Sequence, residues 1–160
     1  DNHSEKAIFG ISHCSNLPEH VAIRQAEAAT QALQEAGFRA DIALEILRLP
    51  STGSGITLWS RSYGAYMGAS SLGKRGLLAE KVGKSAAEEL ALELASSVSV
   101  DIYLADQLIP YLAMAKGSYS TREISLHTRT NIWTASHFLE RKISVLTDDK
   151  SGKDIVKIEA

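Results

Sequence analysis

A stripe of small residues constrains the fold of this 160-residue chain more than any other feature. Between Pro18 and Gly37, apolar residues recur at spacings of three and four, and most are alanine: Ala22, Ala26, Ala29, Leu33 and Ala36. This period predicts a helix that Gly37 ends. Asn16 is its predicted cap, with Pro18 in the first turn and Glu19 reaching back. Because alanine side chains are short, the helix must lie close against its neighbour, for which we expect a sheet.

Strand-like runs lie on both sides of this helix. The predicted order is a strand at 7–14, the helix, strands at 40–47, 56–61 and 66–71, and a second helix at 80–96. A flexible loop is expected at 50–55, where glycine, serine and proline cluster. The resulting β-α-β-β-β-α order indicates a small α/β layered sandwich.

The second half of the chain begins after a predicted joint at residues 96–99. We predict a helix at 101–116 that Pro110 should kink, a strand at 119–126, a helix at 128–140, and strands at 142–146 and 154–158. The predicted fold class is therefore α/β. One domain is expected at residues 1–98 and a second at 99–160.

Composition excludes several classes of protein. The formal net charge of −2 gives no strong field, so any contact with nucleic acid must be local. No run of 18 apolar residues exists, so we expect no contact with a membrane. The single cysteine, Cys14, rules out an internal disulfide and fits a structural thiol in a reducing cytoplasm. Residues 1–6 lack the layout of a signal peptide and an initiator methionine, so we expect a processed chain or a fragment.

The segment from Gly68 to Arg75 nearly spells a phosphate-binding loop, G-x-x-x-x-G-K-[ST]. Arg75 stands where the magnesium-binding hydroxyl belongs, and the next predicted helix starts several residues too late. The segment therefore predicts a glycine-rich turn with two exposed cations, Lys74 and Arg75. Both remain candidates for contact with a nucleic-acid backbone.

Five histidines are present, but no pair has the spacing of a strong metal site, so no metal ligand is predicted. His127 differs by position, because it lies between a predicted strand and a predicted helix, where backbone N–H groups bind anions. Nearby, Asp106 could orient an imidazole or a metal, Gln107 offers a donor and an acceptor, and Tyr103 could stack on a base. From the residues alone, His127 is either a nucleophile toward phosphorus or a structural side chain.

Six segments, taken together, resemble the RNA 3′-terminal phosphate cyclase family, most closely its archaeal branch. They occur in the family's order at residues 16–24, 53–58, 72–76, 79–83, 103–107 and 127–131. The resemblance implies that residues up to about 98 match a small inserted domain. It also implies that the remainder matches the last α/β unit of the large catalytic domain.

The resemblance implies a mechanism and a cytoplasmic ligase. The histidine that matches His127 attacks the α-phosphate of ATP, pyrophosphate leaves, and the histidine carries AMP. AMP then passes to an RNA 3′-phosphate, which the 2′-hydroxyl attacks to give a 2′,3′-cyclic phosphate, with Mg or Mn assisting. In the family, the residues matching Tyr103, Leu104, Ala105, Asp106 and Gln107 line the ATP site. Tyr103 is expected near the adenine, and Asp106 or Gln107 near the ribose or the histidine.

The chain also departs from the family, whose members are considerably longer. The glycine-rich segment and metal-binding acidic residue of their N-terminal half are not found here. We therefore expect the isolated chain to be a poor catalyst or inactive. The exposed apolar surface of the last unit should bind the N-terminal half or a second copy of the chain.

Two alternatives stay open. Ribosome-biogenesis factors of the family share its fold but lack the nucleophile, and the presence of His127 argues against that assignment. The other alternative is a small α/β interaction module in which His127 is structural. In that case the imidazole should be buried and hydrogen-bonded away from any cleft.

Overall fold

The computed structural model describes residues 7–62, 65–115, 117–139, 143–147 and 154–158. These residues form two compact units. Unit 1 contains the described residues up to Ser62 together with Tyr66–Ala95, and unit 2 contains Ala65 and the described residues from Ser96 onward. Both units combine helices with a sheet, so the predicted α/β class is confirmed. Within the described residues, no helix combines the length and apolar character that crossing a bilayer requires.

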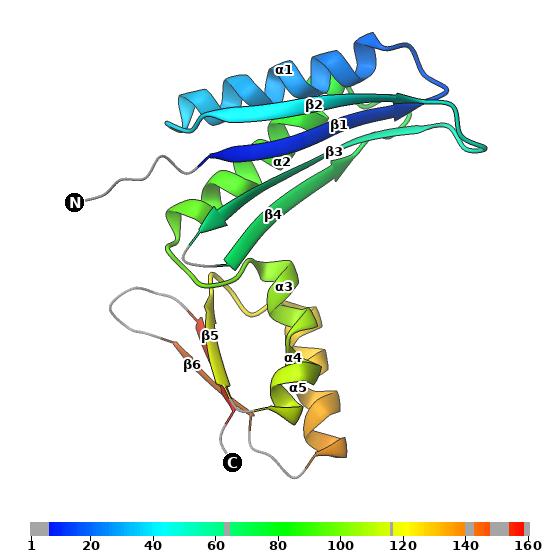
Figure 1. Cartoon of the computed structure of the whole chain (residues 1–160). Helices are drawn as coiled ribbons and strands as arrows, with labels where there is room; N and C mark the ends of the chain where they lie inside the picture. Colours follow the sequence, from blue (N-terminus) through cyan, green and yellow to red (C-terminus); the bar gives the residue numbers. More distant parts are fainter. Residues whose placement is uncertain (1–6, 63–64, 116, 140–142, 148–153, 159–160) are drawn as a thin grey trace. The chain divides into compact units, whose positions relative to one another are not determined.

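Unit 1 is a four-stranded sheet with two helices along one face (Figure 1). The strands are β1 (Ile8–Ser15), β2 (Ala40–Leu47), β3 (Gly53–Ser62) and β4 (Ala65–Leu72), and the helices are α1 (His20–Glu35) and α2 (Ala79–Ala95). The strand order is β2-β1-β3-β4. β1 pairs with β2 in parallel and with β3 in antiparallel fashion. A parallel pair needs a crossover connection, and α1 supplies it.

The alanine stripe forms the inner face of α1, as predicted. Four of its five members are buried, and the fifth, Ala36, caps the C-terminal end of the helix. The hydroxyl of Ser12 in β1 donates to the carbonyl of Ala22 at 2.8 Å, so α1 does contact the sheet. α1 also lies very close to α2, because a Cβ atom at Gly83 would lie 2.0 Å from the carbonyl oxygen of Gln25. The small residues therefore serve a helix–helix contact as well as a helix–sheet contact.

Two local predictions in unit 1 are wrong. Asn16 does not cap α1, because the helix begins at His20 with Glu19 as its N-cap and has no side-chain cap bond. Pro18 therefore precedes the first turn, and Glu19 does not reach back as predicted. Asn16 instead has a φ of 52°, a conformation that asparagine tolerates, and its amide donates to the carbonyl of Leu49 at 2.6 Å. The predicted loop at 50–55 is also too long, because β3 begins at Gly53 and pairs with β1 from there.

Unit 2 is a three-stranded antiparallel sheet combined with three helices. The strands are β5 (Gly117–Thr121), β6 (Ile143–Thr147) and β7 (Asp154–Ile158), in the order β5-β7-β6. The helices are α3 (Ile102–Gln107), α4 (Ile109–Met114) and α5 (Leu126–Phe138). Its core is formed by Val100, Ala105, Ile109 and Tyr119.

The predicted helix at 101–116 is divided in two, as expected from Pro110. α3 ends at Gln107, and Pro110 occupies the first turn of α4, where its missing N–H costs nothing. The predicted strand at 119–126 is too long, because β5 ends at Thr121. The backbone N–H of Ile124 donates to the carboxylate of Asp154 at 3.1 Å, and Ser125 begins the next helix. His127 therefore lies inside a helix and not at the end of a strand.

Candidate functional site

The N-terminal turn of α5 contains His127. Ser125 has an extended backbone, and its hydroxyl accepts a hydrogen bond from the N–H of Thr128 at 3.1 Å. Leu126 and His127 are therefore the first two residues of the helix, where N–H groups lack intrahelical acceptors. The imidazole is exposed. His127 therefore lies beside backbone N–H groups, as predicted. These groups belong to the first turn of α5 and not to a junction between a strand and a helix.

A second cap sets the position of the 103–107 segment. The Asp101 carboxylate oxygen Oδ1 accepts from the N–H groups of Tyr103 at 3.0 Å and Leu104 at 2.7 Å. These bonds start α3, and the negative charge at a helix N-terminus adds to their effect. The side chains of Tyr103 and Gln107 are exposed, those of Leu104 and Asp106 are half-buried, and that of Ala105 is in the core.

The structure brings the two predicted segments together through Asn131. This residue lies one helical turn after His127 on the same face of α5. Its side-chain amide donates to the backbone carbonyl of Asp106 at 3.1 Å. The sequence placed Asn131 only within a motif, and no signal in one sequence shows that it joins α5 to the end of α3.

Tyr119 was also missed by sequence reasoning, which placed it in a strand without a role. Its hydroxyl donates to the carbonyl of Ala105 at 2.5 Å. Burial raises the pKa of this hydroxyl above its usual range, and the negative charge of Asp106 raises it further. Tyr119 therefore remains a hydrogen-bond donor at neutral pH and holds the middle of the 103–107 segment.

The other residues considered in the sequence analysis lie in ordinary structural surroundings. Cys14 is fully buried, as expected of a structural thiol. Lys74 and Arg75 are exposed in a turn that precedes α2, so the prediction of two exposed cations is confirmed. His137 is exposed on α5, with Nδ1 2.7 Å from the carbonyl oxygen of Trp133. His3 lies outside the described residues.

No metal-binding cluster is evident in the part of the chain that the structure describes. No group of three or more His, Cys, Asp or Glu side chains is arranged there to hold an ion. The Asn131 bond reaches the backbone carbonyl of Asp106 and not its carboxylate. The described residues therefore do not fit a metal site of their own.

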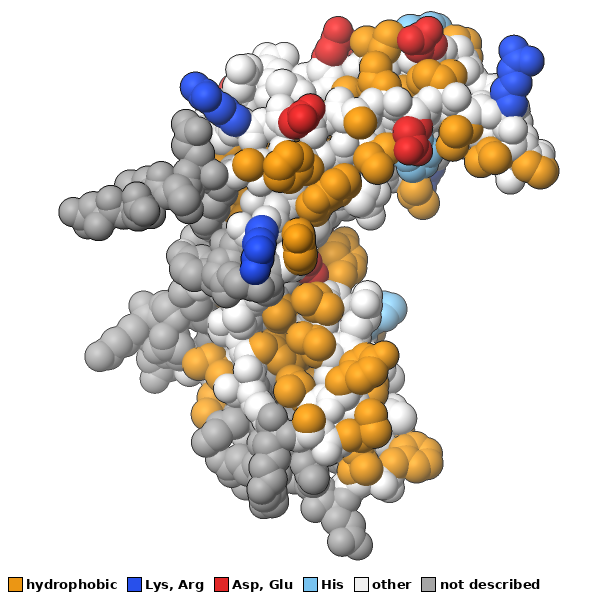
Figure 2. Space-filling model, in the orientation of Figure 1, with side chains coloured by type: hydrophobic (Ala, Val, Ile, Leu, Met, Phe, Trp, Pro, Cys, Tyr) orange, Lys and Arg blue, Asp and Glu red, His pale blue; other side chains and the backbone are white. Residues whose placement is uncertain are grey.

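Exposed apolar side chains gather over the helices of unit 2 (Figure 2). The large ones are Tyr103, Tyr111, Met114, Leu126, Trp133 and Phe138, each at least half exposed. A cavity of about 300 Å³ lies beside α4 and α5 and is lined by Met114, Asn131 and Phe138 among others. An apolar surface of this kind is typical of an interface with another polypeptide.

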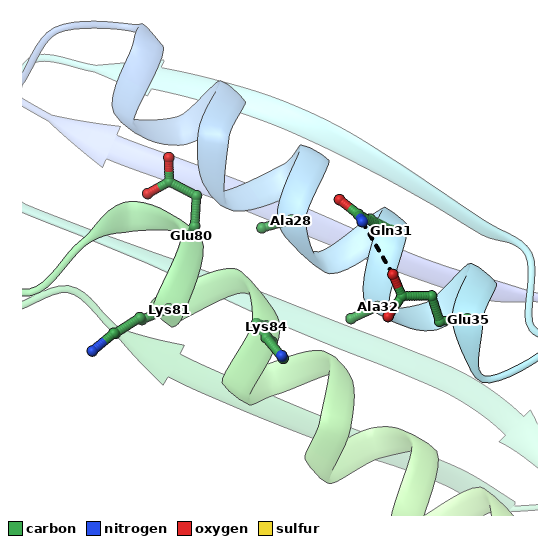
Figure 3. Close-up of a pocket in the computed structure, with 7 residues that line it drawn as sticks. All are labelled: Ala28, Gln31, Ala32, Glu35, Glu80, Lys81 and Lys84. Atoms are coloured by element: carbon green, nitrogen blue, oxygen red, sulfur yellow. Dashed lines mark hydrogen bonds between the residues drawn. The ribbon is translucent and has the colours of Figure 1, made fainter.

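Two further cavities lie on described residues of unit 1. One, of about 300 Å³, lies between α1 and α2, and Figure 3 shows Ala28 and Ala32 on one side and Lys81 and Lys84 on the other. The other, of about 470 Å³, lies beside the turn that carries Lys74. Neither contains a residue predicted for nucleotide chemistry from the family resemblance.

Comparison with known proteins gives one consistent result. Residues 4–95 match the family model described as RNA 3′-terminal phosphate cyclase, insert domain. A protein named RNA 3′-terminal phosphate cyclase from Methanosarcina acetivorans is 53% identical over 95% of this chain, and its namesake from Methanococcoides burtonii is 50% identical over 99%. A third, from Pyrococcus abyssi, is 42% identical over 91% of the chain. The matched regions span 41%, 46% and 42% of those relatives, which is less than half of their length.

Proposed function

Since this chain belongs to the RNA 3′-terminal phosphate cyclase family, we propose that it is the C-terminal portion of a ligase that converts an RNA 3′-phosphate into a 2′,3′-cyclic phosphate at the expense of ATP. The observation that supports this most strongly is the identity of 53% over nearly the whole chain to a protein named for that reaction. The aligned region covers 95% of the chain and so includes the segment around His127.

His127 is the proposed nucleophile. Its neutral imidazole attacks the α-phosphorus of ATP, a P–N bond forms, and the bond to pyrophosphate breaks. The exposure of the side chain and the N–H groups of the first turn of α5 support this role, because those groups can stabilise charge on the phosphoryl oxygens. A buried imidazole bonded away from solvent would have favoured a structural role.

The next two steps transfer and then release AMP. An oxygen of the RNA 3′-phosphate attacks the histidine-bound phosphorus, the P–N bond breaks, and a mixed anhydride forms. The neighbouring 2′-hydroxyl then attacks the RNA phosphorus, loses its proton to solvent or a base, and displaces AMP. Activation is needed because a phosphate dianion is a poor electrophile, whereas AMP is a good leaving group.

We assign the 103–107 segment to the ATP site. Tyr103 is exposed and suits the adenine. We assign Asp106 or Gln107 to the ribose or to His127. Leu104 and Ala105 form the wall of the site, with Ala105 contributing backbone because its side chain is buried. Asn131 acts as a positioning residue that holds this wall against the helix of His127.

The isolated chain is proposed to be inactive or nearly so. A divalent metal, Mg or Mn, is expected for the whole enzyme, but the described residues supply no ligand cluster, and we derive no step through it. The exposed apolar residues on α3–α5 support a partner that covers them. We propose the N-terminal half of the cyclase as that partner, or else a second copy of this chain.

Labelling with [α-³²P]ATP tests the proposal. The chain is incubated with ATP and Mg²⁺ or Mn²⁺, with and without a separately produced N-terminal half. Label that is acid-labile and alkali-stable is expected, mainly when the N-terminal half is present. His127→Ala should abolish it, whereas the matched control His137→Ala, an exposed histidine of the same helix, should retain it. Absence of label from a confirmed complex of folded chains would instead favour a non-catalytic RNA-binding relative.

A further inference from the structure

Positive charge accumulates around the start of α2 in unit 1. Residues 74–84 contain four cations and one acid, Glu80, although the whole chain has a net charge of −2. The guanidinium of Arg24 forms two hydrogen bonds to Glu80, of 2.6 and 2.9 Å. The carboxylate is therefore neutralised within the protein, and the segment keeps a local positive charge.

The cavity of about 470 Å³ lies beside the first two of these cations. Lys74 and Arg75 line it, together with apolar side chains that include Leu77, Leu78 and Val82. Leu77 and Leu78 are 41% and 57% exposed, so both side chains can contact a bound molecule. The cavity thus combines an apolar wall with a cationic rim.

The turn that carries the two cations is fixed in place. The N–H of Gly73 donates to the carbonyl of Ser54 at 2.9 Å, and a Cβ atom at Gly73 would lie 2.2 Å from the Ser54 hydroxyl. After the cations, Gly76 has a φ of +80°, which favours glycine. Lys74 and Arg75 therefore project from a backbone whose conformation is already set, and this lowers the entropic cost of binding a ligand.

Further cations continue along α2. In Figure 3, Lys81 and Lys84 lie at the groove between α1 and α2, while Glu80 points toward α1. Lys84 is 3.7 Å from Glu88, and both side chains are well exposed, so this ion pair is weak and open to competition. A polynucleotide bound at the first cavity would therefore meet further cations along α2.

We propose that this surface binds single-stranded RNA, with phosphates at Lys74 and Arg75 and one base against Leu77 and Leu78. The inference rests on the proposed function, which supplies a polynucleotide as the substrate, and it adds a binding surface on unit 1. The cations match the phosphates of a polynucleotide, and the apolar wall matches the face of a base. Every base has an apolar face, so binding here is independent of sequence.

Fluorescence anisotropy with the intact chain tests this. The probe is a labelled single-stranded RNA of about ten nucleotides that ends in a 3′-hydroxyl, which removes any dependence on end chemistry. Reversing both cations, Lys74→Glu with Arg75→Glu, should weaken binding about tenfold or more. The slope of log Kd against log salt concentration should also fall by about 1.4, which is about 0.7 for each phosphate that is no longer neutralised. Leu78→Ser should weaken binding without changing that slope.

The matched control reverses two other exposed cations of unit 1, Arg48→Glu with Arg61→Glu. It changes the net charge equally and should leave RNA affinity within about twofold of the starting chain, since both sites lie outside the cavity. Thermal unfolding of all variants verifies that they are folded. Equal losses of affinity in both pairs, no RNA binding by the unmodified chain, or equal competition by an acidic peptide would overturn the proposal.

The test is separate from that of the proposed function. Labelling of His127 by ATP needs no RNA, so it can be measured apart from RNA binding. Failure of RNA binding with intact labelling would remove only the inference about unit 1, and the reverse result would remove only the assignment of His127.

Discussion

Unit 1 buries its large side chains far more completely than unit 2. Among the described residues, nine of the eleven largest fully buried side chains lie in unit 1, and only Val98 and Ile109 lie in unit 2. Unit 2 instead contains the two most exposed large apolar side chains of the described residues, Phe138 at 82% and Leu126 at 77%. The unit that carries the candidate nucleophile is therefore the one whose large apolar side chains are less completely buried.

The largest expected loss of stability comes from a substitution in the core of unit 1. Gly83→Ala places a Cβ atom 2.0 Å from the carbonyl oxygen of Gln25, so α1 and α2 must separate. We expect a loss of about 3 kcal/mol in the free energy of unfolding, more than the gain of about 1 kcal/mol in helix propensity. Urea unfolding followed by circular dichroism measures this.

Gly53→Ala is the control for that substitution, because a Cβ atom there meets nothing within 4 Å. Its unfolding midpoint should stay close to that of the starting chain. A Gly83→Ala chain as stable as the control would show that the α1–α2 packing is looser than the structure indicates.

A smaller effect is expected in unit 2. Tyr119→Phe removes the hydrogen bond to the carbonyl of Ala105 and leaves a buried acceptor unpaired, at a cost of about 1–3 kcal/mol. Because the pKa of Tyr119 is raised on folding, its contribution is fully present below the unfolded value of about 10 and is lost as the pH rises above it. The phenylalanine variant should lack this component of alkaline destabilisation.

The measurement compares the unfolding midpoints of the starting chain and of Tyr119→Phe between pH 8 and 11. This range brackets the ordinary tyrosine pKa of about 10. Parallel curves for the two chains would contradict the assigned role of Tyr119. The unit-specific readout is hydrogen exchange of amides in α3, which should quicken while exchange in α1 stays unchanged.

The smallest expected loss of stability comes from a substitution at Asn131. This variant tests whether Asn131 positions the site or only packs within unit 2. Asn131→Ala removes the bond to the carbonyl of Asp106, at a cost of about 0.5–1.5 kcal/mol. The labelling of His127 in the reconstituted enzyme should fall by a larger factor than this stability loss explains. Thr130→Ala is the matched control, because its hydroxyl bonds only within α5, to the carbonyl of Leu126. Equal labelling by both variants would reduce Asn131 to a packing residue.

The helices were easier to predict than the site because their signals are local. The alanine stripe of α1 and the division at Pro110 follow from spacing and from a missing N–H, both visible in a few neighbouring residues. The extent of β5 was misjudged because residues 122–126 suit a strand by composition, while the Asp154 carboxylate and the Ser125 cap end it. The bonds of Tyr119 and Asn131 join residues distant in sequence, so only the folded chain shows them.

The serine cap of α5 sets a rotational register for the histidine. An α-helix turns by about 100° per residue, so one residue inserted between Ser125 and His127 would swing the imidazole by about 100° around the axis of α5. The same insertion would force a choice, because the cap and the bond from Asn131 to α3 could no longer both form in their present positions. Anyone who transplants this helix into another scaffold must therefore preserve the number of residues between cap, histidine and asparagine, and not only their identities.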